Sequence, residues 1–130
     1  MQYTMKLFDK PYRAIKNRKK TIELRLCDEK RKNICEGDII IFYLYGKMDK
    51  FIKTRVIHVY KFASFAELYK NLPLEKCGYS EEELEDANPD DMNIYYSLEE
   101  QSKYGVVGIE VEVMSDVTEK VAKSLRNTSK

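Results

Sequence analysis

The chain has 130 residues, 43% of them hydrophobic and 35% charged, and its 23 lysines and arginines nearly balance its 22 acids. These values indicate one globular domain that can bury a core without disulfides or structural metals. No apolar run in the sequence approaches the roughly 20 residues that span a bilayer. Because the N-terminal residues also lack the long apolar core of a secretion signal, we expect a cytoplasmic protein.

The N-terminal part of the chain predicts a strand followed by a short helix. Apolar residues alternate weakly over residues 3–8, which favours a strand. Asp9 can cap a helix, and Pro11 is tolerated in its first turn. We therefore expect a helix that reaches about Asn17.

A second strand is predicted over residues 21–26, in the segment NRKKTIELRL. Successive side chains of a strand point to opposite faces of the sheet. Two rows result: the apolar row Ile22, Leu24 and Leu26, and the polar row Thr21, Glu23 and Arg25. The polar row is expected to face water, either as an ordinary surface or as the floor of a binding site.

Two longer strands follow. The β-branched and aromatic run IIIFYLY, residues 39–45, predicts a buried strand, and residues 50–60 predict a long one. His58, the single histidine, lies in this long strand on the row of Ile52 and Val56. We expect it to be packed or hydrogen-bonded rather than catalytic.

An acidic helical insert is predicted over about residues 64–102, and a final strand over residues 105–114. Three S-x-x-E sequences, which are typical of helix capping boxes, begin at Ser64, Ser80 and Ser97. The insert therefore consists of several short helices, each with its own start signal.

This order of elements favours an α+β fold. The strands are too closely spaced for repeated βαβ units, so we expect a small mixed, mostly antiparallel β-barrel with short flanking helices. A single domain would occupy residues 1–114, and residues 115–130 would form a C-terminal helix or a frayed tail.

Charge is distributed unevenly along the chain. Residues 10–32 carry ten lysines and arginines and three acids, residues 44–61 carry five and one, and residues 73–112 carry two and twelve. A fold that separates these segments has a basic face, which would attract phosphates, and an acidic face.

Several kinds of chemistry lack their usual motifs. The sequence contains neither a GxxxxGK[ST] nor a GxGxxG phosphate loop and no Cys/His set with zinc spacing, so we expect no metal and no cofactor. The cysteines, Cys27, Cys35 and Cys77, are odd in number and form no CxxC pair. This favours free thiols in a reducing compartment.

Four segments, in this order, resemble the ASCH domain: KKTIELRL, CDEKRKNICEGDIIIFY, VIHVYKFASFAELY and QSKYGVVGIEVE. The resemblance covers roughly residues 4–113. It implies a PUA-like β-barrel, a binding cleft beside the strand 21–26, and an association with RNA or nucleotides. The family also includes small amidohydrolases that deacylate an acylated cytidine.

The resemblance to those amidohydrolases weakens at the catalytic positions. Their corresponding motif has the pattern K-T-[IV]-T-[IL]-R, so its lysine falls on Lys20, its first threonine on Thr21 and its arginine on Arg25. Their second threonine, the proposed nucleophile, falls on Glu23, which has no hydroxyl group. Their catalytic glutamate falls ambiguously near residues 75–77. The fold therefore carries over better than the reaction.

On such a barrel we expect a basic cleft with the ligand-binding residues Lys20, Thr21, Glu23, Arg25 and Tyr104, and with Tyr43 or Tyr45 as further stacking residues. Lys20 and Arg25 would contact phosphates, and Glu23 would accept a hydrogen bond from a base edge. The alternative is an exposed Glu23–Arg25 ion pair that contributes little to stability.

Three functions stay open at this point. The first is an RNA- or nucleotide-binding protein that uses the basic cleft. The second is an amidohydrolase that acts on an acylated nucleoside, with Lys20 and Glu23 as its catalytic residues. The third is an adaptor that binds a protein through the insert, although Phe65, Leu68 and Leu84 look like core residues.

Overall fold

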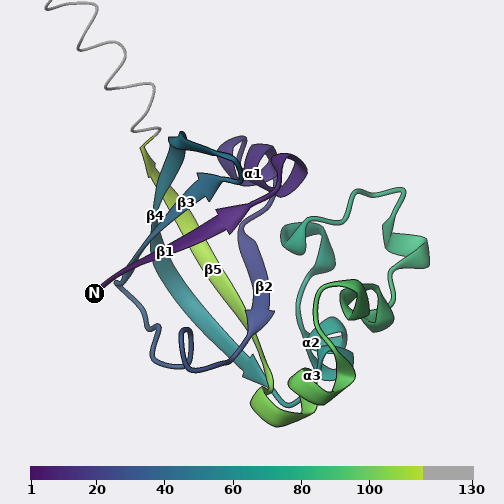
Figure 1. Ribbon diagram of the computed structural model, residues 1–130. Coiled ribbons are helices and arrows are strands. Elements are labelled where there is room, and N and C mark those ends of the chain that lie inside the picture. Colours follow the sequence, from purple (N-terminus) through teal and green to yellow (C-terminus); the bar gives the residue numbers. More distant parts are fainter. Residues whose placement is uncertain (116–130) are drawn as a thin grey trace, which may run out of the picture.

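Five strands form one curled sheet in the computed structural model, which describes residues 1–115 (Figure 1). Their order in the sheet is β1-β3-β4-β5-β2. The pairing of β1 with β3 is parallel, and the other three pairings are antiparallel. The strands are β1 (Gln2–Leu7), β2 (Ile22–Leu26), β3 (Ile39–Leu44), β4 (Lys47–Phe62) and β5 (Val106–Ser115).

This architecture confirms the predicted α+β fold with a mixed, mostly antiparallel sheet. The sheet is a curled half-barrel whose two edge strands are β1 and β2. Every predicted strand is present, and β4 extends beyond the predicted residues 50–60 at both ends. The expected C-terminal helix or frayed tail lies in residues 116–130, outside the described residues.

In the long strand β4, the alternation of side chains between the two faces of the sheet is interrupted near the middle of the strand. Its register against β5 shifts between Val56 and His58, so that two residues of β4 oppose one of β5. Such a bulge moves the following side chains to the other face. His58 is therefore exposed, although the alternation placed it on the buried row of Val56. Its Nδ1 lies 3.2 Å from the Glu36 carboxylate, which is the hydrogen-bonded role expected for it.

Two hydrophobic clusters stabilise the fold. The first fills the concave side of the sheet and includes Phe42, Ile52 and Ile109, all with 0% exposure. The second lies between β2, the start of β5 and the insert, and includes Phe65 and Leu68. The predicted core role of these two insert residues is confirmed, and Leu84 is half-buried.

One α-helix, α1 (Asp9–Lys16), joins β1 to β2. It buries Tyr12 and Ile15, and Phe8 occupies the N-cap position that was expected for Asp9. Asp9 is instead the first residue of the helix and pairs with Arg13 at 2.9 Å.

The insert follows β4 and lies beside β2 (Figure 1). It contains the α-helices α2 (Phe65–Asn71) and α3 (Leu98–Tyr104) and the 3-10 helices η1 (Leu74–Cys77), η2 (Leu84–Asp86) and η3 (Pro89–Ile94). All three predicted S-x-x-E devices form, because Ser64, Ser80 and Ser97 each accept the amide N–H of the glutamate three residues later. None of the helices within residues 1–115 has the length and apolar character needed to cross a membrane.

Candidate ligand-binding site

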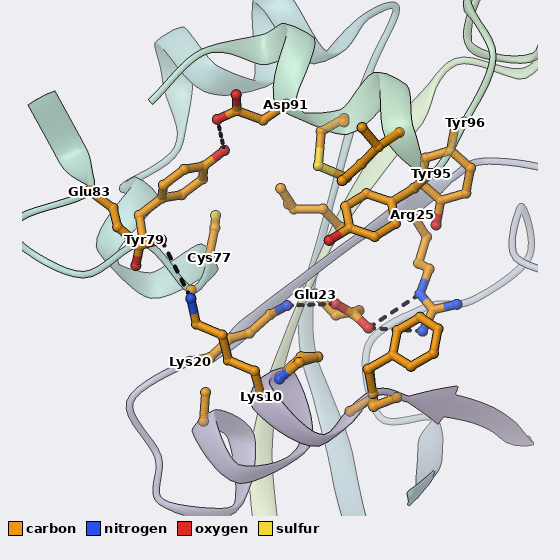
Figure 2. A pocket seen from close by; sticks show the side chains of 18 of the residues that line it. Lys10, Lys20, Glu23, Arg25, Cys77, Tyr79, Glu83, Asp91, Tyr95 and Tyr96 are labelled. Atoms are coloured by element: carbon orange, nitrogen blue, oxygen red, sulfur yellow. Dashed lines mark hydrogen bonds and ion pairs between the residues drawn. The ribbon is translucent and has the colours of Figure 1, made fainter. Parts of the chain in front are cut away.

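A pocket of about 800 Å³ lies where the half-barrel is open, between the edge strands β1 and β2. Residues from the end of β1, α1, β2 and the insert line it. The insert forms one wall, so the pocket lies between the sheet and the helical segment (Figure 2). Lys20, Glu23 and Arg25, which the sequence placed at a cleft, are all among its lining residues.

The register of β2 against β5 explains why charged side chains enter this pocket. Glu23 pairs with Ile109 and Arg25 pairs with Val107. Paired residues point to the same face of a sheet, and both partners on β5 belong to the core on the concave side. Glu23 and Arg25 therefore point to the concave side, toward the opening between β1 and β2.

This orientation corrects the expectation that the polar row of β2 faces water. Glu23 is only 4% exposed. The apolar row of β2 packs under the insert in the second cluster, so both faces of the strand are covered. The period-two pattern correctly separated the two rows, but the row with Glu23 and Arg25 is buried at a site.

The three charged side chains form an ion triad on the pocket floor (Figure 2). Lys20 Nζ donates to Glu23 Oε1 at 2.8 Å, and Arg25 donates to Glu23 Oε2 through Nε at 3.2 Å and Nη2 at 3.0 Å. The side chains are 11%, 5% and 16% exposed, respectively. The alternative prediction of an exposed Glu23–Arg25 ion pair is therefore wrong, because the pair is buried and Lys20 also binds Glu23.

The triad keeps Glu23 ionised. Burial alone would raise the pKa of Glu23, but the charges and hydrogen bonds of Lys20 and Arg25 lower it to about 2. Burial likewise would lower the pKa of Arg25, but the interactions with Glu23 and Tyr96 outweigh it and raise this pKa. The triad thus carries a fixed net charge of one positive unit, and its carboxylate is a poor proton acceptor at neutral pH.

Lys20 lies against η1 and the glycine that follows it. The amide of Thr21 donates to the carbonyl oxygen of Lys76 at 2.9 Å, which ties the start of β2 to η1. Gly78 has a φ of +110°, and a Cβ there would lie 3.2 Å from Lys20 Cδ. A side chain at position 78 would therefore be strained in its backbone and would press against Lys20.

Aromatic residues of the insert line one wall of the pocket. The Tyr79 hydroxyl donates to Asp91 Oδ2 at 2.8 Å and shares a hydrogen bond of 2.6 Å with the Tyr69 hydroxyl. Burial and these hydrogen bonds raise the pKa of Tyr79. Gln101 Nε2 donates to the Tyr96 carbonyl oxygen at 3.0 Å and so anchors the segment with the other aromatic rings. The aromatic lining residues are Phe8, Tyr69, Tyr79, Tyr95 and Tyr96.

The charged lining residues come from both the basic and the acidic segment. Lys10 Nζ lies 3.5 Å from Glu83 Oε2, across the pocket from α1 to the insert (Figure 2). At the pocket, the fold therefore brings the two segments together instead of placing them on separate faces. Within the described part of the chain, four cations and four carboxylates line it: Lys6, Lys10, Lys20, Arg25, Glu23, Glu83, Asp90 and Asp91.

Some of the expected ligand-binding residues lie outside this lining. Thr21 has a buried hydroxyl oxygen without a hydrogen-bond partner among residues 1–115, and Tyr104 packs against the second hydrophobic cluster. Tyr43 packs against Phe51, with ring centroids 5.8 Å apart. Tyr45 packs against Phe8, which lines the pocket.

The contribution of α1 and of the insert to the site was not predicted from the sequence. Lys10, Tyr79, Tyr95 and Tyr96 all line the pocket. The paired aromatics of the segment NIYYS, residues 93–97, are the signal in the sequence that could have indicated this wall.

Glu75 and Cys77, which lie in the region aligned with the catalytic glutamate of the amidohydrolases, are poorly suited to catalysis in this pocket. In the region that aligned with the amidohydrolase glutamate, Cys77 lines the pocket and Glu75 does not. Burial, partly opposed by Lys20, raises the pKa of the Cys77 thiol to about 12, so the thiol stays neutral. Among residues 1–115, no three His, Cys, Asp or Glu side chains gather as a metal site.

Comparisons with known proteins agree with this fold. The family model of the ASCH domain matches residues 5–115. The crystal structure of hypothetical protein PH0355 has a TM-score of 0.70 and 36% sequence identity, covering 88% of this chain and 100% of that chain. The solution NMR structure of protein PF0455 from Pyrococcus furiosus has a TM-score of 0.63 and 35% identity, covering 88% of this chain and 99% of that one. A search of curated proteins finds no match.

Proposed function

Because the chain belongs to the ASCH domain family, whose PUA-like members generally bind RNA, we propose that its pocket binds one nucleotide unit of RNA or a nucleotide-like small molecule. The observation that carries this proposal is the Lys20–Glu23–Arg25 triad, which lies on the floor of a pocket lined by aromatic rings.

The size and lining of the pocket support a ligand of this class. A volume of about 800 Å³ lies within the usual range for small-molecule sites of roughly 300–1,000 Å³. Tyr79 and Tyr95 line the pocket with aromatic rings against which a base can stack, and stacking is tolerant of base identity. A double helix is too wide for this space, so the proposed ligand enters as an unpaired nucleotide unit.

The cations of the pocket have different roles in this proposal. Lys6 and Lys10 are exposed at its mouth, where a phosphate can exchange water for protein contacts. Lys20 and Arg25 are already paired with Glu23, and each keeps further N–H donors for the ligand. The attraction is local rather than a general basic field, because acids and cations are equal in number among the described residues that line the pocket.

Glu23 takes a different role from the one expected. Both of its carboxylate oxygens accept hydrogen bonds within the triad, so they are not free for a base edge. Its pKa of about 2 also makes it unsuitable as the general base of an amidohydrolase at neutral pH. Glu23 instead holds Lys20 and Arg25 in position, and binding without catalysis is the function we favour.

The test is a binding titration of ribonucleoside 5′-monophosphates, unphosphorylated nucleosides and short RNAs at two salt concentrations. We expect saturable binding of phosphorylated ligands that weakens as salt is raised. Lys10→Gln and Tyr95→Ala should weaken it, whereas the exposed control variants Lys19→Gln and Leu98→Ala, whose residues lie outside the lining, should not.

Two outcomes would contradict the proposal. Absent or salt-independent binding by the wild type would remove the phosphate-binding function. Turnover of acylated cytidine by the wild type, assayed in parallel and lost in Lys20→Ala, would establish the amidohydrolase in its place.

A further inference from the structure

Two aromatic rings form an exposed pair at the edge of the pocket. Phe8 and Tyr45 are 61% and 62% exposed, and their ring centroids are 5.3 Å apart with an interplanar angle of 50°. Phe8 also lines the pocket, whereas Tyr45 does not. The pair therefore continues the aromatic surface of the pocket outward onto the surface of the sheet.

The backbone places the two rings next to each other. Phe8 lies between β1 and α1, where it occupies the N-cap position of the helix. Tyr45 lies in the turn between β3 and β4, and its amide donates to the carbonyl oxygen of Leu7 at 2.8 Å. Because this bond ties the turn to the end of β1, the two rings stay adjacent without a hydrophobic core around them.

The charges beside this pair differ from those on the insert side of the pocket. Lys6 precedes Phe8 by two residues and Lys47 follows Tyr45 by two, and both lysines are exposed. Within residues 1–115, neither lysine has a carboxylate at ion-pair distance, whereas Lys10 faces Glu83 at 3.5 Å. Unpaired cations next to exposed rings are the combination that proteins use to bind single strands of nucleic acid.

We propose that single-stranded RNA is the preferred ligand, and that it leaves the pocket over the Phe8–Tyr45 pair. This inference rests on the proposed function, since one nucleotide occupies the pocket itself. The neighbouring base stacks on the exposed ring of Tyr45, and its phosphate contacts Lys6 or Lys47. The strand leaves on this side because Glu83, Asp90 and Asp91 repel phosphates on the other.

The test compares a ribonucleoside 5′-monophosphate with single-stranded oligoribonucleotides of two, four and eight residues. We expect the affinity of the wild type to rise from the monophosphate to the dinucleotide or tetranucleotide. Tyr45→Ala should weaken oligonucleotide binding about fivefold or more, the loss typical of one stacked base, and should leave monophosphate binding unchanged. The exposed Ile57, on β4 and outside the pocket lining, provides the control variant Ile57→Ala.

Each outcome separates this inference from the proposed function. Equal affinity for the monophosphate and the oligonucleotides overturns the RNA path and leaves the pocket as a nucleotide site. Oligonucleotide binding that is insensitive to Tyr45→Ala also overturns it and is the result expected if the ring pair contacts a protein. Failure of every nucleotide ligand to bind contradicts the proposed function itself.

Discussion

Arg25 donates a hydrogen bond through Nη2 to the backbone carbonyl oxygen of Lys6, at 3.0 Å, and so connects the two edge strands of the sheet. The same guanidinium binds Glu23 through Nε and Nη2. One side chain thus spans the open side of the half-barrel and also fixes the floor of the pocket. Site and fold are therefore coupled at β2, and a change to Arg25 should affect both.

The planar guanidinium is needed for these contacts, so Arg25→Lys should destabilise the fold. A lysine has a single ammonium group and cannot bind Glu23 in two places while it also reaches Lys6. We expect the free energy of unfolding to fall by about 1–3 kcal/mol, measured by urea denaturation. Arg55→Lys is the control, because Arg55 forms an exposed pair with Glu112 at 3.3 Å and should change stability by less than about 0.5 kcal/mol. Equal effects of the two variants would show that Arg25 acts as an ordinary surface charge.

The low pKa of Glu23 predicts a specific loss of stability in acid. The pKa is 4.5 ordinarily and about 2 in the fold, so the ionised form contributes stability fully above about pH 4.5. This contribution is lost as the pH falls from about 4.5 toward about 2, and it amounts to roughly 3 kcal/mol. The measurement is the difference in unfolding free energy between the wild type and Glu23→Gln, at several pH values. Other carboxylates titrate in both proteins, so they cancel in the difference. A difference that stays constant down to pH 2.5 would contradict the buried triad.

The three cysteines should differ in reactivity in the native protein. Cys35 is exposed, although its hydrogen bond to Asp38 raises its pKa, and Cys77 is buried with a pKa raised to about 12. Alkylation at pH 8 should therefore modify Cys35 first and Cys77 last, and urea should remove the difference. Mass spectrometry of peptides from the partly alkylated protein measures the order. Rapid native labelling of Cys77, or an intramolecular disulfide, would contradict this arrangement.

The pair between Lys10 and Glu83 should compete with an anionic ligand. Glu83→Gln frees Lys10 and removes a negative charge from the pocket. We expect it to tighten binding of a nucleoside monophosphate by roughly two- to fivefold at low salt, the range of an exposed ion pair. Glu82→Gln makes the same charge change at a neighbouring exposed residue outside the lining, and it serves as the control. Weaker binding in Glu83→Gln would mean that the ligand uses this carboxylate.

The elements of this fold could be predicted from local patterns. Alternation indicated β2 and β5, and the serine–glutamate pairs indicated the helix starts at Ser64 and Ser97, because both signals depend on neighbours in sequence. The exposure of His58 could not be read in this way. The bulge that turns it outward depends on how β4 pairs with β5, a relationship between segments about 50 residues apart.

The site was predictable only in part, for a related reason. Lys20, Glu23 and Arg25 could be assigned to one cleft because they lie within six residues of chain, and because Lys20 and Arg25 match positions of a family motif in which Glu23 replaces a threonine. The burial of Glu23 depends instead on the position of the insert and on the open seam beside β1. A period-two pattern separates the faces of a strand, but it does not say what covers each face.

The pocket between β1, β2 and the insert is the site at which we propose that a nucleotide unit binds. The most direct measurement is a titration of the ¹⁵N-labelled protein with ribonucleoside 5′-monophosphates, followed by amide chemical shifts in NMR spectra. Binding in the pocket predicts saturable shifts for the amides of Leu24, Gly78, Tyr79 and Tyr95, and little change around Arg55 and Glu112. Shifts centred on Arg55 and Glu112, or no saturable shifts at all, would contradict it.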